Sequence, residues 1–229
     1  KFMCKIIFDQ IGEKFYELGV SKCVLFVMDK DTHNYKDGVA WNGITSISET
    51  PEGADKTDIY ADNTKYASFR ALETFGGTIE AYTYPDEFAE CDGSISPKKG
   101  LNIGQQGRKT FALAYKTQVG SDIDSEASAY KIHIIYGCTC SPTERSYETI
   151  NDSPESDPFS WEFDSTPVPI EGYKDTSIIT LDSRATEQAA ALKTIEDMIY
   201  ETGKLPMPAD ILKAYGVTSN TESESNPTH

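Results

Sequence analysis

The sequence contains little of the material that catalysis and metal binding use most. Among its 229 residues there are only three histidines, His33, His133 and His229. It has no G-x-S-x-G elbow and no H-E-x-x-H motif, so the usual nucleophile and zinc arrangements of hydrolases are excluded. We therefore expect a protein that is not an enzyme, with no catalytic residue, no metal and no cofactor.

Positive charge and long apolar runs are also scarce. The chain has 21 Lys and Arg residues against 37 Asp and Glu residues, a formal net charge of −16 at pH 7. Because nucleic-acid binders hold phosphates mainly through Lys and Arg, this balance argues against such binding as the main role. The longest apolar run, residues 23–28, is far shorter than the roughly 18–20 residues of a membrane-spanning helix. We expect no membrane span.

Cysteines are few and odd in number. The five cysteines are scattered along the chain, at Cys4, Cys23, Cys91, Cys138 and Cys140. An odd, scattered set in a long chain indicates buried or free thiols in a reducing compartment, so we expect no disulfide bonds. Cys138 and Cys140 share one face of an expected strand, but the second ligand pair of a zinc site is missing.

Acidic residues form two groups that imitate functional motifs. Asp122, Asp124 and Glu126 begin like a calcium loop, but Ala127 stands where the sixth position requires Gly. The other group could supply the carboxylate pair of a glycosidase and consists of Asp86, Glu87, Glu90 and Asp92. In so acidic a chain such groups arise easily. A solvated short helix after Pro85 is the favoured interpretation, and a carboxylate-pair hydrolase ranks third among the possible functions.

Apolar and polar residues alternate with a period of two through the first three quarters of the chain. This pattern is typical of half-buried strands. It predicts strands over residues 22–28, 38–48, 65–71, 78–84, 109–117, 129–136, 160–165 and 177–181. Turn signals such as Gly76-Gly77 and Asp92-Gly93 lie between them. The sequence therefore predicts a mainly β fold, an antiparallel β-sandwich or barrel.

The periodicity becomes helical after Ser183. Apolar residues on one face and a stop at Gly203 predict a helix over 185–201, and Pro208 begins a shorter helix that Gly216 ends. We expect a β domain over 20–183, a C-terminal helical segment over 184–216 and a flexible polar tail over 217–229. Residues 1–19 form an N-terminal arm, which is apolar enough to pack on its own domain or on a neighbouring subunit.

The segment 49–62 is polar and lies between two expected strands. The pattern predicts a long exposed loop or an extended hairpin. Loops of this length are uncommon in compact domains unless they are functional or disordered, and a merely solvated insertion remains the alternative.

Several stretches, occurring in a fixed order, carry a resemblance to a known family. They are Gly38-Val-Ala-Trp-Asn-Gly-Ile-Thr45, Tyr60-Ala-Asp62, Glu80-Ala-Tyr-Thr-Tyr-Pro-Asp-Glu-Phe-Ala-Glu-Cys-Asp-Gly93, Gly104-Gln-Gln-Gly-Arg-Lys109, Tyr130-Lys-Ile-His-Ile-Ile-Tyr-Gly137, and Asn151-Asp-Ser-Pro154 leading to Phe159-Ser-Trp-Glu162. The chain resembles the major tail tube proteins of long, non-contractile-tailed bacteriophages. The likeness spans about residues 12–181, and the acidic block ending at Gly93 together with residues 104–109 is its most specific part.

The resemblance implies a tail-tube β-sandwich with a flanking helix that assembles into stacked hexameric rings. Such rings form a hollow tube through which DNA leaves the capsid without being specifically bound. The implied partners are further copies of the chain and the tape measure, tail terminator and distal tail proteins, with no membrane. The implied location is the virion tail, assembled in the host cytoplasm. A net charge of −16 suits such a conduit, because an acidic wall repels phosphates.

The resemblance also suggests which residues meet the neighbouring ring. In similar tube proteins a long hairpin at the corresponding place reaches along the tube. We therefore expect contacts between rings from residues of the 49–62 segment, namely Glu49, Thr50, Pro51, Glu52, Asp55, Lys56, Asp58 and Tyr60.

Strand alternation suggests which residues line the lumen. In the expected strand 160–165, Trp161 and Phe163 share one face while Glu162 and Asp164 share the other. Glu80 alternates similarly and is a third candidate. The competing interpretation places these acids on the exterior for solubility.

Two other functions remain open. One is the inner tube of a contractile tail or of a phage-tail-like particle. The other is a non-viral β-sandwich module that binds carbohydrate or mediates adhesion, which would also combine many strands and exposed aromatic residues with a low isoelectric point.

Overall fold

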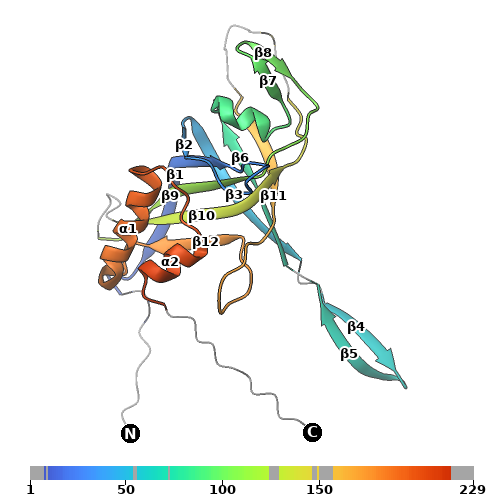
Figure 1. Cartoon of the computed structure of the whole chain (residues 1–229). Helices are drawn as coiled ribbons and strands as arrows, with labels where there is room; N and C mark the ends of the chain where they lie inside the picture. Colours follow the sequence, from blue (N-terminus) through green and yellow to red (C-terminus); the bar gives the residue numbers. More distant parts are fainter. Residues whose placement is uncertain are drawn as a thin grey trace.

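Figure 1 shows the computed structural model, which describes residues 8, 10–53, 56–71, 73–123, 129–145, 149 and 157–217. The described part is mainly β with antiparallel sheets and a C-terminal pair of helices, so the predicted fold class is confirmed. In chain order the elements are β1 (Phe15–Val27), β2 (Val39–Trp41), β3 (Ile44–Gly53), β4 (Lys56–Ala61), β5 (Thr64–Arg70), β6 (Glu73–Ala81), the 3₁₀ helix η1 (Asp86–Glu90), β7 (Ile95–Lys98), β8 (Leu101–Ile103), β9 (Phe111–Ser121), β10 (Ala129–Cys140), β11 (Phe159–Ser165), β12 (Ile178–Asp182), η2 (Thr186–Gln188), α1 (Ala189–Tyr200) and α2 (Pro208–Ala214).

The main sheet has the strand order β2-β1-β9-β10-β11-β6-β3 and divides at β10. The first half of β10 pairs with β12, while its last residues pair with β11. Between the two halves Gly137 has a φ of +61°, and the register with β9 shifts there. A Cβ at this position would lie 2.2 Å from the Thr166 carbonyl oxygen. Such a bulge bends a strand, and it lets β11, β6 and β3 turn back over β1 and β9.

The inner core fills the space between the two halves of the folded sheet. Its side chains come from β1, β2, β6, β9, β10 and β11 and from η1. Trp161 is fully buried at its centre, with ring centroids 5.2 Å from Phe88, 5.4 Å from Tyr84 and 5.7 Å from Trp41. Trp41 also donates a hydrogen bond from Nε1 to the Thr83 carbonyl at 2.9 Å. These rings join β2, β11 and η1 into one unit.

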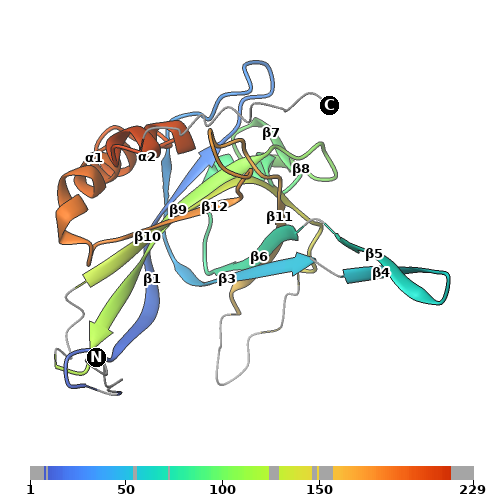
Figure 2. The ribbon, with the colours of Figure 1, turned by 90° about the horizontal axis from the view of Figure 1, so that it is seen from below.

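A second core lies between the sheet and the helices. Alternate residues of β1, β9 and β10 point outward here, and Leu192, Ile195 and Ile199 of α1 cover them with Ile211 of α2. Figures 1 and 2 show both helices on this side of β1, β9, β10 and β12. The layers therefore run from helices, through β1-β9-β10-β12 and the inner core, to β11-β6-β3.

Several element boundaries differ from the sequence-based predictions. The first strand starts at Phe15, so the end of the predicted N-terminal arm belongs to β1 and pairs with β9. The predicted strand 38–48 is two strands, with Asn42 and Gly43 between them. Gly76 and Gly77, predicted to mark a turn, lie inside β6, where the missing side chains let Phe163 approach. Of the predicted tail, the structure describes only Val217.

Candidate functional site

The outer surface of β3, β6 and β11 forms a polar, acidic sheet face. We define this acidic face by Ser46, Ser48, Thr50, Glu52, Thr74, Gly76, Thr78, Glu80, Ser160, Glu162 and Asp164. The set holds four carboxylates and no Lys or Arg. In the sheet register Glu162 lies opposite Thr78, and Asp164 lies opposite Gly76. Solvent reaches Glu52, Glu162 and Asp164, so the face that points away from the helices carries exposed negative charge.

Alternation along β11 is as the sequence predicts. Trp161 and Phe163 are buried in the inner core, whereas Glu162 and Asp164 are exposed on the acidic face. The third candidate, Glu80, lies on the same face but is half-buried, and its Oε2 accepts a hydrogen bond from Ser46 Oγ at 2.7 Å. The structure thus brings the three predicted carboxylates onto one surface.

A two-stranded hairpin, β4 and β5, projects away from the folded sheet (Figure 1). Its strands pair with each other in a separate sheet, with Ile59 opposite Ala67 and Thr57 opposite Phe69. Ile59 and Phe69 therefore share an apolar face, on which they are 45% and 59% exposed. An isolated two-stranded hairpin is marginally stable in water. Exposed apolar residues on such a hairpin are typical of a surface that meets a partner.

The other face of the hairpin is charged. The Lys65 Nζ lies 2.8 Å from Asp58 Oδ1, and the Lys56 Nζ lies 3.7 Å from the same oxygen. Hydrogen bonds from Lys65 and Ser68 lower the pKa of Asp58. The contact of Lys65 with Asp58 links β5 to β4, whereas Lys56 lies on the same strand as Asp58.

The predicted ring-contact residues lie on different parts of this region. Thr50, Pro51 and Glu52 pair with β6 in the main sheet, and Lys56, Asp58 and Tyr60 lie on the projecting hairpin. Asp55 lies outside the described residues. The side chain of Glu49 does not lie on the acidic face. It contacts His133 in a polar cluster, which is described below.

Sequence reasoning missed the second arm of the hairpin. A strand was predicted over residues 65–71 but was not recognised as part of the hairpin; β5 pairs with β4 and exposes Tyr66 and Phe69. The overlooked signal was the pair Asp62-Asn63, both at positive φ. Asp and Asn are among the few residues that accept this backbone conformation, which a tight two-residue hairpin turn requires.

A polar cluster links β3 to β1 and β10, around His133. The His133 Nε2 lies 3.1 Å from Glu17 Oε1, and its Nδ1 lies 3.2 Å from Glu49 Oε1. Tyr115 stacks on the imidazole ring at 4.9 Å and donates a hydrogen bond from Oη to Glu49. Lys131 donates to the other Glu17 oxygen at 2.5 Å. Among the described residues no backbone ladder joins β1 to β3, and this cluster supplies polar side-chain links between these two strands.

Both carboxylates of the cluster have lowered pKa values. Burial by itself raises the pKa of Glu17, but hydrogen bonds from Lys131, Thr117 and His133 outweigh it and lower that pKa to about 2. The pKa of Glu49 is lowered mainly by its hydrogen bond with His133, against burial, with a smaller contribution from Tyr115. Glu17 and Glu49 therefore stay ionised near neutral pH.

Glu17 makes stability depend on pH in the acid range. Its pKa is about 2 in the folded chain against 4.5 as the ordinary value, so its stabilising contribution is full above pH 4.5 and is lost as the pH falls toward 2. We expect wild type to be more stable than Glu17→Gln at pH 6, with the difference shrinking between pH 4.5 and 2. Urea unfolding at a series of pH values measures it, with Glu187→Gln as a surface control. A difference that stays constant down to pH 2 would contradict this assignment.

The other chemically suggestive groups are engaged in packing or ion pairs. The described cysteines Cys23, Cys91, Cys138 and Cys140 are buried free thiols, and burial raises the pKa of Cys91 to about 12, which disfavours the thiolate. In the acidic group near η1, Glu90 pairs with Lys109 at 2.5 Å and Asp92 pairs with Arg145. Within the described ranges, no three His, Cys, Asp or Glu residues are arranged to hold a metal ion. No described helix has the length and apolar character to cross a membrane.

Comparisons with known proteins find a likeness among solved structures. No protein-family model and no curated protein matches the sequence. Among solved structures, the chain is similar to one from a cryo-EM structure of an extracellular contractile injection system, the PVC sheath-tube complex in its extended state. The identity is 11%, the TM-score is 0.29, and the match covers 70% of this chain and 88% of that chain. A likeness at this TM-score carries no weight for the fold or for the function.

Proposed function

We propose that the chain is a structural subunit, without catalytic activity, that assembles into stacked hexameric rings forming the hollow tube of a phage tail. The observation that carries the proposal is the layered arrangement, with helices on one side of the folded sheet and an exposed acidic face on the other. The sequence resemblance to major tail tube proteins supports the same role. The tape measure, tail terminator and distal tail proteins are the proposed further partners, in a virion assembled in the host cytoplasm.

The acidic face suits the wall of a DNA channel. A channel must let a polyanion pass without holding it, and binding strength comes from Lys and Arg contacts to phosphates. The face has Glu52, Glu162 and Asp164 exposed and no basic residue among the side chains that define it. Repeated around a ring, these carboxylates give a continuous negative field within about one Debye length of the wall, roughly 8 Å at physiological salt.

The helices fit the outside of such a tube. The apolar side chains of the helices that face the sheet are buried in the second core. Glu187 in η2 and Glu201 directly after α1 are exposed. A surface whose apolar residues are buried needs no further partner. The projecting hairpin, in contrast, exposes Ile59 and Phe69, and it supplies the contact to the next ring.

A charge reversal on the acidic face tests the conduit role. We expect Glu162→Lys/Asp164→Lys to assemble into tubes but to slow DNA ejection from virions, most strongly at low salt, because new phosphate contacts must break as DNA moves. The control Glu187→Lys/Glu201→Lys makes the same charge change on the helical side and should eject at the wild-type rate. Ejection measured by dye uptake at several salt concentrations gives the comparison. Equal ejection rates for both variants at low salt would show that this face does not line the channel.

Assembly itself is tested by sedimentation of the purified protein. We expect large species whose fraction grows with concentration, since ring and stack formation follow mass action. A sample that sediments as a monomer at all concentrations would contradict the proposal and favour the carbohydrate-binding or adhesion alternative.

A further inference from the structure

A second hairpin, β7 and β8, exposes apolar residues and carries a basic turn. Ile95, Leu101 and Ile103 are between 44% and 53% exposed. The exposed Lys98 ends β7, and the exposed Lys99 lies in the turn with Gly100, which has a φ of +85°. The whole segment from Ile95 to Ile103 has no acidic residue. In a chain with a net charge of −16, this hairpin is a locally positive, partly apolar surface.

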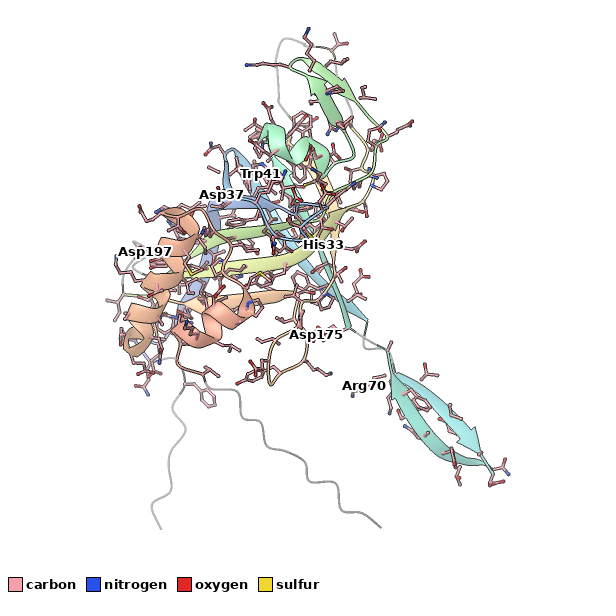
Figure 3. The ribbon with its side chains drawn as sticks, in the orientation of Figure 1. His33, Asp37, Trp41, Arg70, Asp175 and Asp197 are labelled. Carbon is pink, nitrogen blue, oxygen red and sulfur yellow. The ribbon has the colours of Figure 1, made fainter. Side chains whose placement is uncertain are left out.

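The turn of the β4–β5 hairpin carries a carboxylate instead, while Lys65 just after the turn is paired with Asp58 at 2.8 Å. Asp62 is exposed in its turn, and Tyr60 and Tyr66 beside the turn are 68% and 78% exposed. Figure 1 shows the two hairpins at opposite ends of the molecule. In Figure 3 Arg70 marks the base of the β4–β5 hairpin, which extends away from the sheet beyond it.

We propose that the β7–β8 hairpin of one copy receives the tip of the β4–β5 hairpin of the next copy along the tube. This inference rests on the proposed function, and it names the receiving surface. The two surfaces differ from each other and lie at opposite ends, so their contact is heterologous. It joins copies head to tail into an open stack rather than closing a dimer.

Charge and apolar area both favour this pairing over contact between like hairpins. Two β7–β8 hairpins would bring Lys98 and Lys99 against the same lysines, and like charges in contact oppose association. Asp62 against the lysine turn instead gives attraction between copies whose net charges repel. The same contact would remove exposed apolar side chains from water, namely Tyr60, Tyr66, Leu101 and Ile103.

Reversal and restoration of charge test the pairing in tube-elongation assays followed by light scattering. At low salt, Lys98→Glu/Lys99→Glu should slow elongation, by about five- to tenfold if each contact has the strength of a good exposed ion pair. Asp62→Lys should slow it similarly, and the combination of all three substitutions should return elongation to within about threefold of wild type. Near 1 M salt, where the Debye length is about 3 Å, the differences should disappear.

Two further variants keep the result interpretable. Asp62→Asn removes the charge and suits the positive φ of the turn, so a smaller slowing is expected without a folding defect. Asp37→Lys makes the same reversal on the body of the molecule (Figure 3) and should elongate normally. If the wild type forms tubes but the combined variant does not regain its elongation rate, the hairpin pairing alone is overturned. Absence of wild-type tubes would overturn the proposed function together with it.

Discussion

Tube growth is expected to stop when the β4–β5 hairpin is removed, while the subunit remains folded. Gly53 and Glu73 are paired neighbours in the β3–β6 register, so residues 54–72 can be replaced by Asn-Gly, a sequence that favours a two-residue hairpin turn. No residue of β4 or β5, both of which the structure describes in full, belongs to either hydrophobic core. The loss should therefore fall on contacts between copies and leave the thermal unfolding of the monomer nearly unchanged.

A matched pair of point variants tests whether assembly needs the exposed apolar face of the hairpin or only the presence of the hairpin. Ile59→Ser/Phe69→Ser keeps the strand pairing but removes the exposed apolar face, and we expect it to reduce assembly strongly. Thr57→Ser on the same face is the control and should assemble normally. Electron microscopy and sedimentation measure tube length and mass. Normal tubes from the deletion variant would remove the hairpin from the assembly mechanism.

Trp161→Ala is expected to lower the free energy of unfolding by about 3–5 kcal/mol, the usual cost of deleting a large buried aromatic side chain. Trp161 is fully buried and contacts rings from β2, η1 and the loop that contains Tyr84. The cavity would separate β2 and η1 from β11. Because domains are stable by only about 5–15 kcal/mol, this loss is a large fraction of the total.

Urea unfolding followed by circular dichroism measures the effect. Trp161→Phe retains most of the ring contacts and should lose less stability than Trp161→Ala. The neighbouring substitution Glu162→Ala, on the exposed side of the same strand, should stay within about 0.5 kcal/mol of wild type. Equal midpoints for Trp161→Ala and Glu162→Ala would show that Trp161 does not anchor the inner core.

Local sequence patterns predicted the elements well where burial on one face decides the structure. The alternation in β11 and the helical spacing around Ile195 and Ile199 both reflect a single apolar face. The patterns did not reveal that the sheet folds at Gly137, because a bulge depends on which strands pair with β10. They also missed β7 and β8, short strands that are exposed on every residue.

The same distinction holds for the candidate site. Glu162 and Asp164 could be placed on one exposed face from alternation alone, since their neighbours Trp161 and Phe163 require burial. Glu49 could not be placed in this way, because its position follows from His133 and Tyr115, which are far away in sequence. The hairpin tip needed the pairing of β4 with β5, which the turn residues Asp62 and Asn63 make possible.

Cryo-electron microscopy of the purified, concentrated protein tests most directly whether this chain forms a tube with its acidic face toward the lumen. We expect hollow tubes of stacked six-fold rings, with Glu162 and Asp164 on the inner wall and α1 on the outer wall. Featureless monomers, or tubes with α1 facing the channel, would contradict it.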